Sequence, residues 1–169
     1  WEGGGGSSSR LRDWLDPNNS GAVWGNYWQP SGPPNDSCGQ PGLGVITSLP
    51  YSQSNSTLFA ANNFNSTGGC AANNSPEVIW FLELPCDHEI TVSSCGSGFD
   101  TQIFVYQVGT CLDVYSMPGC NDDYCGLQSQ VSFTAWGGYR YMIVLEGFGS
   151  AAGNYVMNIT GYSTSAQPN

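Results

Sequence analysis

The residues after Asn35 form a series of short runs in which large apolar side chains alternate with polar ones, and turn-forming residues separate the runs. In PEVIWFLELP (76–85) the alternation places Val78, Trp80 and Leu82 on one face of an extended chain, because successive side chains of a strand point to opposite faces. This pattern favours a sheet with one buried face. It recurs in EITVSS (89–94), QVSFTAW (130–136), YRYMIVLEG (139–147) and NYVMNIT (154–160).

Other runs complete a set of eight or nine short strands. TQIFVYQV (101–108) is apolar on both faces, as expected of a central strand in a sandwich. No segment shows a sustained helical period. Weaker strands are predicted at Val45–Leu49, Thr57–Ala61 and Leu112–Ser116. The sequence therefore predicts an all-β fold, an antiparallel jelly-roll-like β-sandwich.

A segment of different composition precedes these runs. WEGGGGSSS (1–9) is a flexible spacer by composition, and PSGPP (30–34) is a stiff, extended hinge. The alternating pattern ends near residue 162. We therefore predict an extended N-terminal arm at 1–34, a β-sandwich at 35–162 and a short C-terminal tail at 163–169.

Five segments of the body occur in an order that is typical of one domain family. They are NDSC (35–38), PEVIWFLELPC (76–86), ITVSSCGSGFDTQIFVY (90–106), CNDDYCGLQSQVSFTA (120–135) and YRYMIVLEGFGSAAGNYVMNIT (139–160). In this order they resemble the pre-peptidase C-terminal (PPC-like) β-sandwich domains of secreted and surface proteins. The resemblance does not cover residues 1–34. It implies a jelly-roll-like accessory module that is not catalytic, in a family of which some members bind calcium.

The charge distribution argues against two classes of partner. Only 9 % of the residues are charged and none is lysine; residues 1–34 carry a net charge of −1 and residues 35–169 a net charge of −9. A body this acidic repels phosphate backbones and anionic lipid. No stretch approaches the roughly 20 apolar residues of a membrane span. We expect neither nucleic-acid binding nor a membrane span.

Cysteines and glycosylation sequons indicate an oxidising, secretory compartment. The chain has seven cysteines and six Asn-x-Ser/Thr sequons, more sequons than its composition would give by chance. We therefore expect a secreted, extracellular or cell-surface protein that carries N-glycans. The sequons begin at Asn18, Asn35, Asn55, Asn65, Asn73 and Asn158.

The cysteines are interpreted as disulfide staples. Cys86 and Cys95 lie at opposite ends of one predicted strand, roughly 25 Å apart at about 3.3 Å per residue, so they should not pair with each other. Because seven is odd, one thiol is left free or bridges to another chain. We expect Cys38 to pair with Cys70, Cys86 to share one end of the sandwich with Cys111, and Cys95 to share the other with Cys120 and Cys125.

One group of polar residues could hold a metal ion. Asp100 opens the strand at 101–106, and the segment CNDD (120–123) closes the strand that should follow it in the sheet. Antiparallel neighbours bring these two ends together, so their oxygen atoms could surround Ca²⁺. The competing interpretation is that the same side chains form Asx turns. The candidate ligands are Asp100, Asn121, Asp122 and Asp123, and no other cofactor is expected.

No residue pattern indicates an enzyme. His88, the only histidine, lies in a short turn beside a cysteine that we expect to be oxidised, which is a poor place for a general base. Glu77 and Glu83 share the outward face of one predicted strand, and Asp122 and Asp123 are adjacent in a turn. Neither pair forms facing carboxylates across a cleft, as a glycosidase requires.

The aromatic residues of the arm most strongly indicate a function. The arm could fold back on its own sandwich, remain disordered, or lie along another copy of the chain. We favour the last, because an extended segment with bulky side chains after a flexible spacer suits strand addition to an open sheet edge. The residues that would bury their side chains in this way are Leu11, Trp14, Leu15, Val23, Trp24, Tyr27 and Trp28.

Head-to-tail docking of this kind does not close on itself, and it therefore produces filaments. The sequence predicts a secreted glycoprotein subunit that assembles with other copies of itself into an extracellular fibre. The alternative is a non-catalytic carbohydrate-binding or accessory module, in which Tyr124, Trp136 or Tyr162 is exposed and stacks on sugar rings.

Overall fold

The computed structural model describes residues 32–38, 44–66, 70, 75–111 and 113–164. The chain divides into two compact units, Trp1–Ser31 and Gly32–Asn169, and all the described residues belong to the second. Within them no helix is long and apolar enough to cross a membrane. The strands are β1 (Val45–Ile46), β2 (Tyr51–Ser56), β3 (Val78–Glu83), β4 (His88–Ser93), β5 (Thr101–Val108), β6 (Val114–Asn121), β7 (Gln130–Ala135), β8 (Arg140–Gly147) and β9 (Asn154–Ser163).

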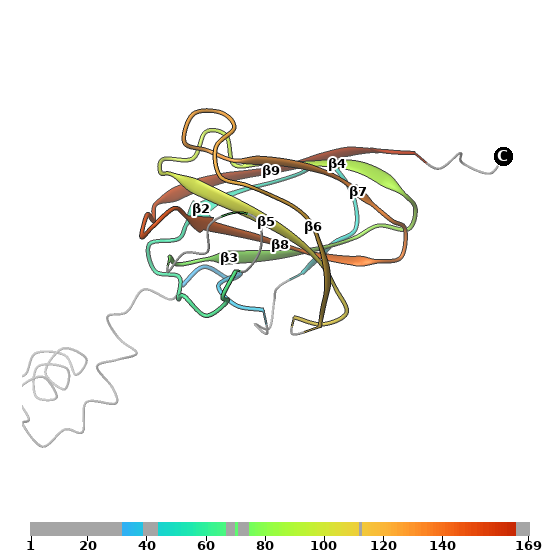
Figure 1. Cartoon of the computed structure of the whole chain (residues 1–169), viewed down its shortest axis with the longest axis horizontal. Helices are drawn as coiled ribbons and strands as arrows, with labels where there is room; N and C mark the ends of the chain where they lie inside the picture. The colour runs from blue at the N-terminus through green and yellow to red at the C-terminus, as the bar shows by residue number, and fades with distance from the viewer. Residues whose placement is uncertain (1–31, 39–43, 67–69, 71–74, 112, 165–169) are drawn as a thin grey trace, which may run out of the picture. The chain divides into compact units, whose positions relative to one another are not determined.

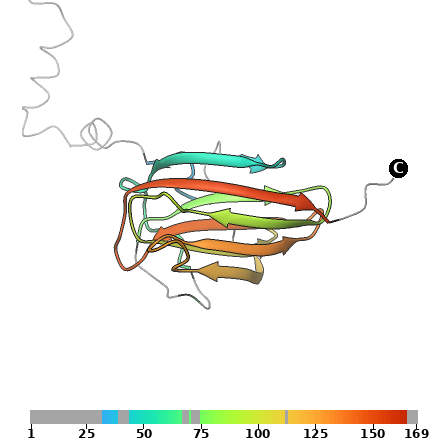
Figure 2. The same cartoon turned by 90° about the horizontal axis from the view of Figure 1, so that it is seen from above.

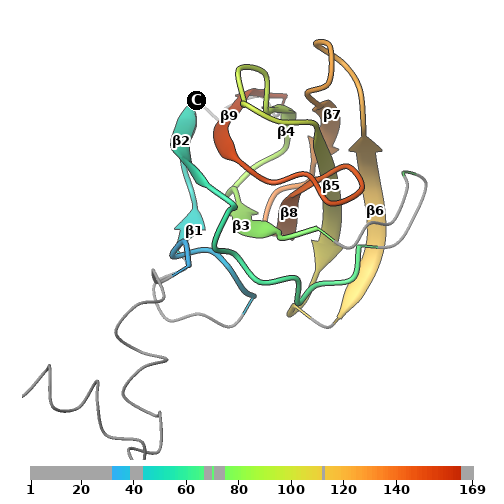
Figure 3. The same ribbon diagram turned by 90° about the vertical axis from the view of Figure 1, so that its left-hand side faces the viewer.

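The strands form two sheets that pack face to face, as the sequence predicts. Sheet A has the order β1-β3-β8-β5-β6 and sheet B the order β2-β9-β4-β7. All neighbouring strands are antiparallel except β1 and β3, which are parallel. The strands of both sheets run close to one common direction (Figures 1 and 2), and the view along them separates the two layers (Figure 3).

The core between the sheets is made by the residues that the alternating pattern assigns to one face. Val78, Trp80, Leu82 and Leu84 of the β3 segment all face this core. Tyr139 opens the run at 139–147, and its spacing predicts an inward-facing side chain, but it lies in the turn before β8 and is exposed. The remaining strands contribute Ile90, Val92, Val131, Phe133, Ala135, Tyr141, Ile143, Leu145, Tyr155, Met157 and Ile159.

Sheet A buries its outer face as well. Seven buried side chains of β3, β5 and β8 form a second apolar cluster there, against which Phe64 and four cysteines pack. Two disulfides, Cys38–Cys111 and Cys70–Cys120, therefore lie over this face and connect its covering loops to the β5–β6 turn and to β6. β5 is apolar on both faces because one face packs in the core between the sheets and the other packs in this outer cluster.

The predictions for the weaker strands were only partly right. Thr57–Ala61 is not a strand; the strand in this region is β2, which has few apolar residues and lies at a sheet edge. The predicted strand at Leu112–Ser116 is in fact β6, which extends to Asn121 through Pro118. Proline removes one backbone N–H donor, and an edge strand tolerates that loss.

The disulfide predictions also need correction. Cys38 pairs with Cys111 and not with Cys70, and Cys86 does not pair with Cys111. The reason is that Cys38 and Cys70 both lie over the outer face of sheet A. There each of them contacts a cysteine that is distant in sequence, Cys111 or Cys120. Cys95 pairs with Cys125, one of the two partners that the sequence allowed, and Cys86 is a free thiol among the described residues.

Candidate functional site

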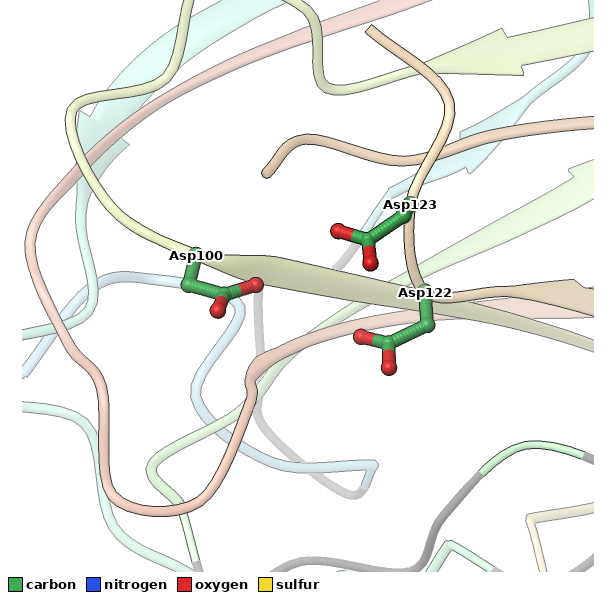
Figure 4. A group of neighbouring side chains, drawn as sticks. All are labelled: Asp100, Asp122 and Asp123. Atoms are coloured by element: carbon green, nitrogen blue, oxygen red, sulfur yellow. The ribbon is translucent and has the colours of Figure 1, made fainter. Parts of the chain in front are cut away.

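Three carboxylates converge at one end of the sandwich. Asp100 lies immediately before β5, and Asp122 and Asp123 follow β6, which pairs with β5 in antiparallel register. One oxygen of each carboxylate lies within 4.8 Å of the others, and Figure 4 shows the three side chains directed toward a common region. The antiparallel pairing thus brings together the aspartates that the sequence analysis selected.

The electrostatics of this cluster suit a cation. Burial, and then the charges of Asp122 and Asp123, raise the pKa of Asp100. Asp100 Oδ1 and Asp122 Oδ1 are buried atoms without a hydrogen-bond partner among the described residues. Uncompensated carboxylate oxygens are costly in a folded protein, and hard cations such as Ca²⁺ are bound by such oxygens.

Asn121 has hydrogen-bond partners of its own in the turn after β6. Its Oδ1 accepts a hydrogen bond from the backbone N–H of Gln130 at 3.1 Å, and its Nδ2 donates to the carbonyl oxygen of Asp123 at 3.4 Å. Both ends of the amide thus fix this turn, which is the Asx-type role that competes with the metal interpretation.

A groove opens at the edge of the sandwich where β1 and β2 lie. Its volume is about 310 Å³, and its lining includes Pro34, Asn35, Tyr51, Gln53 and Trp80 together with residues 44–48. β1 contributes only two paired residues to sheet A, whereas β3 beside it runs for six. Among the described residues β2 pairs with β9 alone and β1 with β3 alone, so within this part of the chain both strands bordering the groove have an open edge.

Hydrogen bonds hold the polar side chains of this groove in place. The Trp80 indole N–H donates to Gln53 Oε1 at 2.6 Å, and the Tyr51 hydroxyl donates to the same oxygen at 2.8 Å. Asn35 is 3 % exposed; its Oδ1 accepts from the Tyr155 hydroxyl at 3.5 Å, while its Nδ2 has no partner among the described residues. The groove therefore combines aromatic surface with a buried amide donor.

The sequons differ in accessibility. Asn55 and Asn65 are exposed, and Asn158 is half-buried on β9 between the inward-facing Met157 and Ile159. Asn35 is buried, and so is its amide nitrogen, the atom that would carry a sugar. Asn18 and Asn73 lie outside the described residues.

The free thiol of Cys86 lies near the only histidine. Its Sγ is 3.9 Å from His88 Nδ1, but that nitrogen is only 2.8 Å from the backbone carbonyl oxygen of Cys86. The imidazole N–H therefore donates to the carbonyl, and the ring is not oriented to take a proton from the thiol. The expectation that His88 lies beside an oxidised cysteine was wrong.

Neither carboxylate pair considered for glycosidase chemistry is arranged across a cleft. Glu77 is buried beneath the loop at 57–66, and its Oε1 accepts the backbone N–H groups of Asn63 at 2.7 Å and Phe64 at 2.5 Å. Burial raises the pKa of Glu77. Glu83, on the same face, forms a partly exposed ion pair with Arg140 at 3.1 Å. Glu77 thus holds the loop at 57–66 in place, a contact that the sequence analysis did not predict.

The self-assembly residues of the arm cannot be placed. Leu11, Trp14, Leu15, Val23, Trp24, Tyr27 and Trp28 all lie outside the described residues. The sequence analysis had not identified the groove, because its lining comes from strand ends and from β2. The sequence signal that could have identified β2, and with it the groove, was the alternation of Tyr51 and Gln53 with serines.

No family model matches the chain, and no curated protein matches it in sequence. Among solved structures, it is similar to the pre-peptidase C-terminal domain of collagenase from Bacillus anthracis, with 10 % identity over 72 % of this chain and 99 % of that chain and a TM-score of 0.44. It is also similar to PliG of Aeromonas hydrophila, a periplasmic inhibitor of g-type lysozyme, with 11 % identity over 70 % and 96 % of the two chains and a TM-score of 0.42. The first description names the family that the sequence resembles.

Proposed function

We propose that the chain is a non-catalytic subunit of an extracellular glycoprotein fibre, in which the arm of one copy docks in the groove between β1 and β2 of the next. The observation that carries this proposal is the groove itself, with its two open strand edges. An added strand would find unpaired backbone groups on β2, and its aromatic side chains would lie over Trp80 and Tyr51.

The arm supplies the complementary chemistry. It offers three large aromatic side chains within five positions, Trp24, Tyr27 and Trp28. Burying one such ring removes roughly 150–250 Å² from water, which is worth several kcal/mol at about 25 cal/mol per Å².

A second copy is a better occupant than the chain's own arm. The groove wall includes Pro34 and Asn35, the residues at which the hinge meets the body. The hinge contains Pro30, Pro33 and Pro34, and proline favours extended backbone in itself and in the residue before it. Three disulfides and exposed sequons suit the extracellular setting of such a fibre.

The direct test compares the full chain with a variant that lacks residues 1–31, so that Pro34 stays in the groove wall. We expect the full chain to form filaments visible by electron microscopy, and the truncated body to remain monomeric in sedimentation velocity. The truncated body should also shorten filaments when mixed with full chain, because it offers a groove but no arm. Filaments formed by the truncated body alone would contradict the proposal.

Groove variants distinguish the two occupants. Thr47→Arg places a long side chain at the exposed rim of the groove, and Ser132→Arg places the same side chain on β7, outside it. Thr47→Arg should abolish filaments and Ser132→Arg should not. The other occupant predicts a different result: the full chain stays monomeric, and its arm resists proteolysis. If Thr47→Arg then makes the arm sensitive to protease, the groove holds the chain's own arm.

Calcium is the cofactor that the acidic cluster fits best. Asp100, Asp122 and Asp123 would hold the ion, which would neutralise three close carboxylates and join the start of β5 to the turn after β6. Its role would be structural. The cluster lies at the end of β7 opposite to Trp136, so calcium would set the shape of one end of the subunit.

A carbohydrate-binding accessory module is the second candidate. Trp136 and Tyr139 are 54 % and 53 % exposed in the β7–β8 turn, and exposed aromatic rings are the surfaces on which sugar rings stack. Tyr124 is also exposed but lies at the other end of β7, so it would not share a sugar with them. Binding of the truncated body to a glycan array, lost in Trp136→Ala, would support this function over the fibre.

A further inference from the structure

The outer face of sheet B carries hydroxyl groups on all four strands. Ser52, Thr91, Ser132 and Thr160 all point away from the core, because their strand neighbours face inward. Thr91 Oγ1 lies 3.0 Å from Ser132 Oγ across the β4–β7 pair. Glu89, which accepts from the Thr134 hydroxyl at 2.7 Å, is the acidic side chain of this face. Unlike the outer face of sheet A, it has no apolar cluster among the described residues.

A sequon and an exposed aromatic ring lie on this same face and on the same strand. Asn158, Thr160 and Tyr162 alternate along β9 with Ile159, which faces the core, and Gly161. Tyr162 is 67 % exposed. Tyr162 lies four positions after Asn158, which at about 3.3 Å per residue corresponds to about 13 Å along the strand.

The surface between Asn158 and Tyr162 is hollowed. A shallow depression of about 480 Å³ is lined by Glu89, Thr91, Ser132, Thr160 and Tyr162, with backbone from the intervening residues. The register explains the arrangement, because Thr160 lies opposite Thr91, and Tyr162 lies opposite Glu89. Hydroxyl groups both donate and accept hydrogen bonds, and a carboxylate accepts them, so this lining suits the hydroxyl groups of a sugar.

Asn158 is also oriented for modification. Its Oδ1 accepts the Ser52 hydroxyl at 2.9 Å, which fixes the amide and leaves Nδ2 as the atom for a sugar. We propose that the N-glycan on Asn158 lies along the outer face of sheet B, with its inner sugars over Thr160 and Thr91 and a sugar ring stacked on Tyr162. This inference does not depend on fibre formation. It assigns the polar face of the sandwich to the chain's own glycan.

The test measures the reactivity of individual tyrosines in the full chain secreted from a eukaryotic host. Mass spectrometry first establishes that Asn158 carries a glycan. Tetranitromethane then nitrates exposed tyrosines, and the rate at each position is read from peptides. We expect Tyr162 to react about two- to tenfold more slowly in the glycosylated chain than in Asn158→Gln, because a stacked sugar covers its ring.

Matched controls separate this effect from a general change in the reactivity of tyrosines across the protein. Tyr115, 68 % exposed on β6, belongs to sheet A and should react at one rate in both proteins. Asn55→Gln removes a different sequon; Asn55 lies opposite the inward-facing Tyr155 and does not share the outer face, so it should leave the rate at Tyr162 unchanged. Enzymatic removal of the glycans from the folded wild-type chain should reproduce the effect of Asn158→Gln.

A second readout follows the sugar itself. Tyr162→Ala should speed endoglycosidase release of the Asn158 glycan from the native chain about two- to tenfold, whereas Tyr115→Ala, on β6 of sheet A, should not change it. An unmodified Asn158 in the secreted chain would overturn the inference. Equal nitration of Tyr162 with and without the glycan, or an unchanged release rate in Tyr162→Ala, would overturn it as well.

Discussion

The two sheets of this sandwich share one core, but their outer faces differ in burial. Sheet A is buried on both sides, and loops stapled by Cys38–Cys111 and Cys70–Cys120 cover its outer face. Sheet B is buried only on its inner side and presents hydroxyl groups outward. Long loops therefore serve sheet A as a third layer, which sheet B does not have among the described residues.

The difference separates apolar burial from polar surface within one sandwich. Sheet A gains stability from a second apolar cluster, and the disulfides limit the entropy that its covering loops would otherwise recover on unfolding. Sheet B gains little from its outer face, which leaves that face available for glycans and water. Stability and surface function are thus assigned to different sheets, and the following predictions test that division.

Truncation of an outward-facing side chain should cost far more in sheet A than in sheet B. Phe104 on β5 is fully buried in the outer cluster of sheet A, so Phe104→Ala should lower the free energy of unfolding by about 3–5 kcal/mol. Ser132→Ala, on the exposed face of sheet B, should change it by less than about 0.5 kcal/mol. Chemical denaturation of both variants provides the measurement, and similar losses would contradict the division.

Removing the staple at β6 should have the next largest effect. The double variant Cys70→Ala/Cys120→Ala opens a loop whose ends are separated by 50 residues, and should lose about 2–4 kcal/mol of stability. Cys86→Ser changes the remaining thiol without opening a loop. It should therefore unfold close to the wild-type midpoint. A large loss in Cys86→Ser would mean that this thiol forms a bond that the structure does not contain.

The inner faces of both sheets could be predicted from sequence because burial of one face forces a period of two. Val131, Phe133 and Ala135 are recognisable from spacing alone, and all three lie in the core. The convergence of Asp100 with Asp122 and Asp123 was predictable for a related reason. Antiparallel strands that follow each other in the chain bring the start of one beside the end of the next.

Features that depend on loops could not be predicted in this way. The cysteine partners are set by where the loops cross sheet A, and sequence separation does not encode that path. β2 was missed because Tyr51–Ser56 has few apolar side chains, which an edge strand does not need. The groove was missed for the same reason, since β2 supplies Tyr51 and Gln53 to it.

Alkaline pH should reveal how dry the inner face of sheet B is. Burial raises the pKa of Tyr155 from 10.0 to about 12. The folded state then holds this proton more tightly than the unfolded state, so the associated stability is present below pH 10 and is lost as pH rises toward about 12. The loss should be on the order of 2 kcal/mol, and smaller in Tyr155→Phe. Equal pH dependence of the two proteins in rapid-mixing unfolding would mean that water reaches Tyr155.

Calcium should produce the smallest effect and the most local one. Deprotonation of Asp100 costs the folded state stability as pH rises through its raised pKa, because the carboxyl is partly desolvated and because Asp122 and Asp123 lie close by. A bound cation removes that cost and should add about 1.4 kcal/mol at ten times its dissociation constant.

Asp122→Asn should abolish this gain without lowering stability in chelator, since it removes one of three like charges. Hydrogen exchange locates the response. The amide N–H groups of Tyr124 and Cys125 both donate to the Gln128 carbonyl in the turn after β6, so they should become more protected with calcium. The amides of β2, at the far edge of sheet B, should not change. Protection that rises equally in both sheets would mean that the ion stabilises the whole sandwich, and that the two sheets do not respond separately.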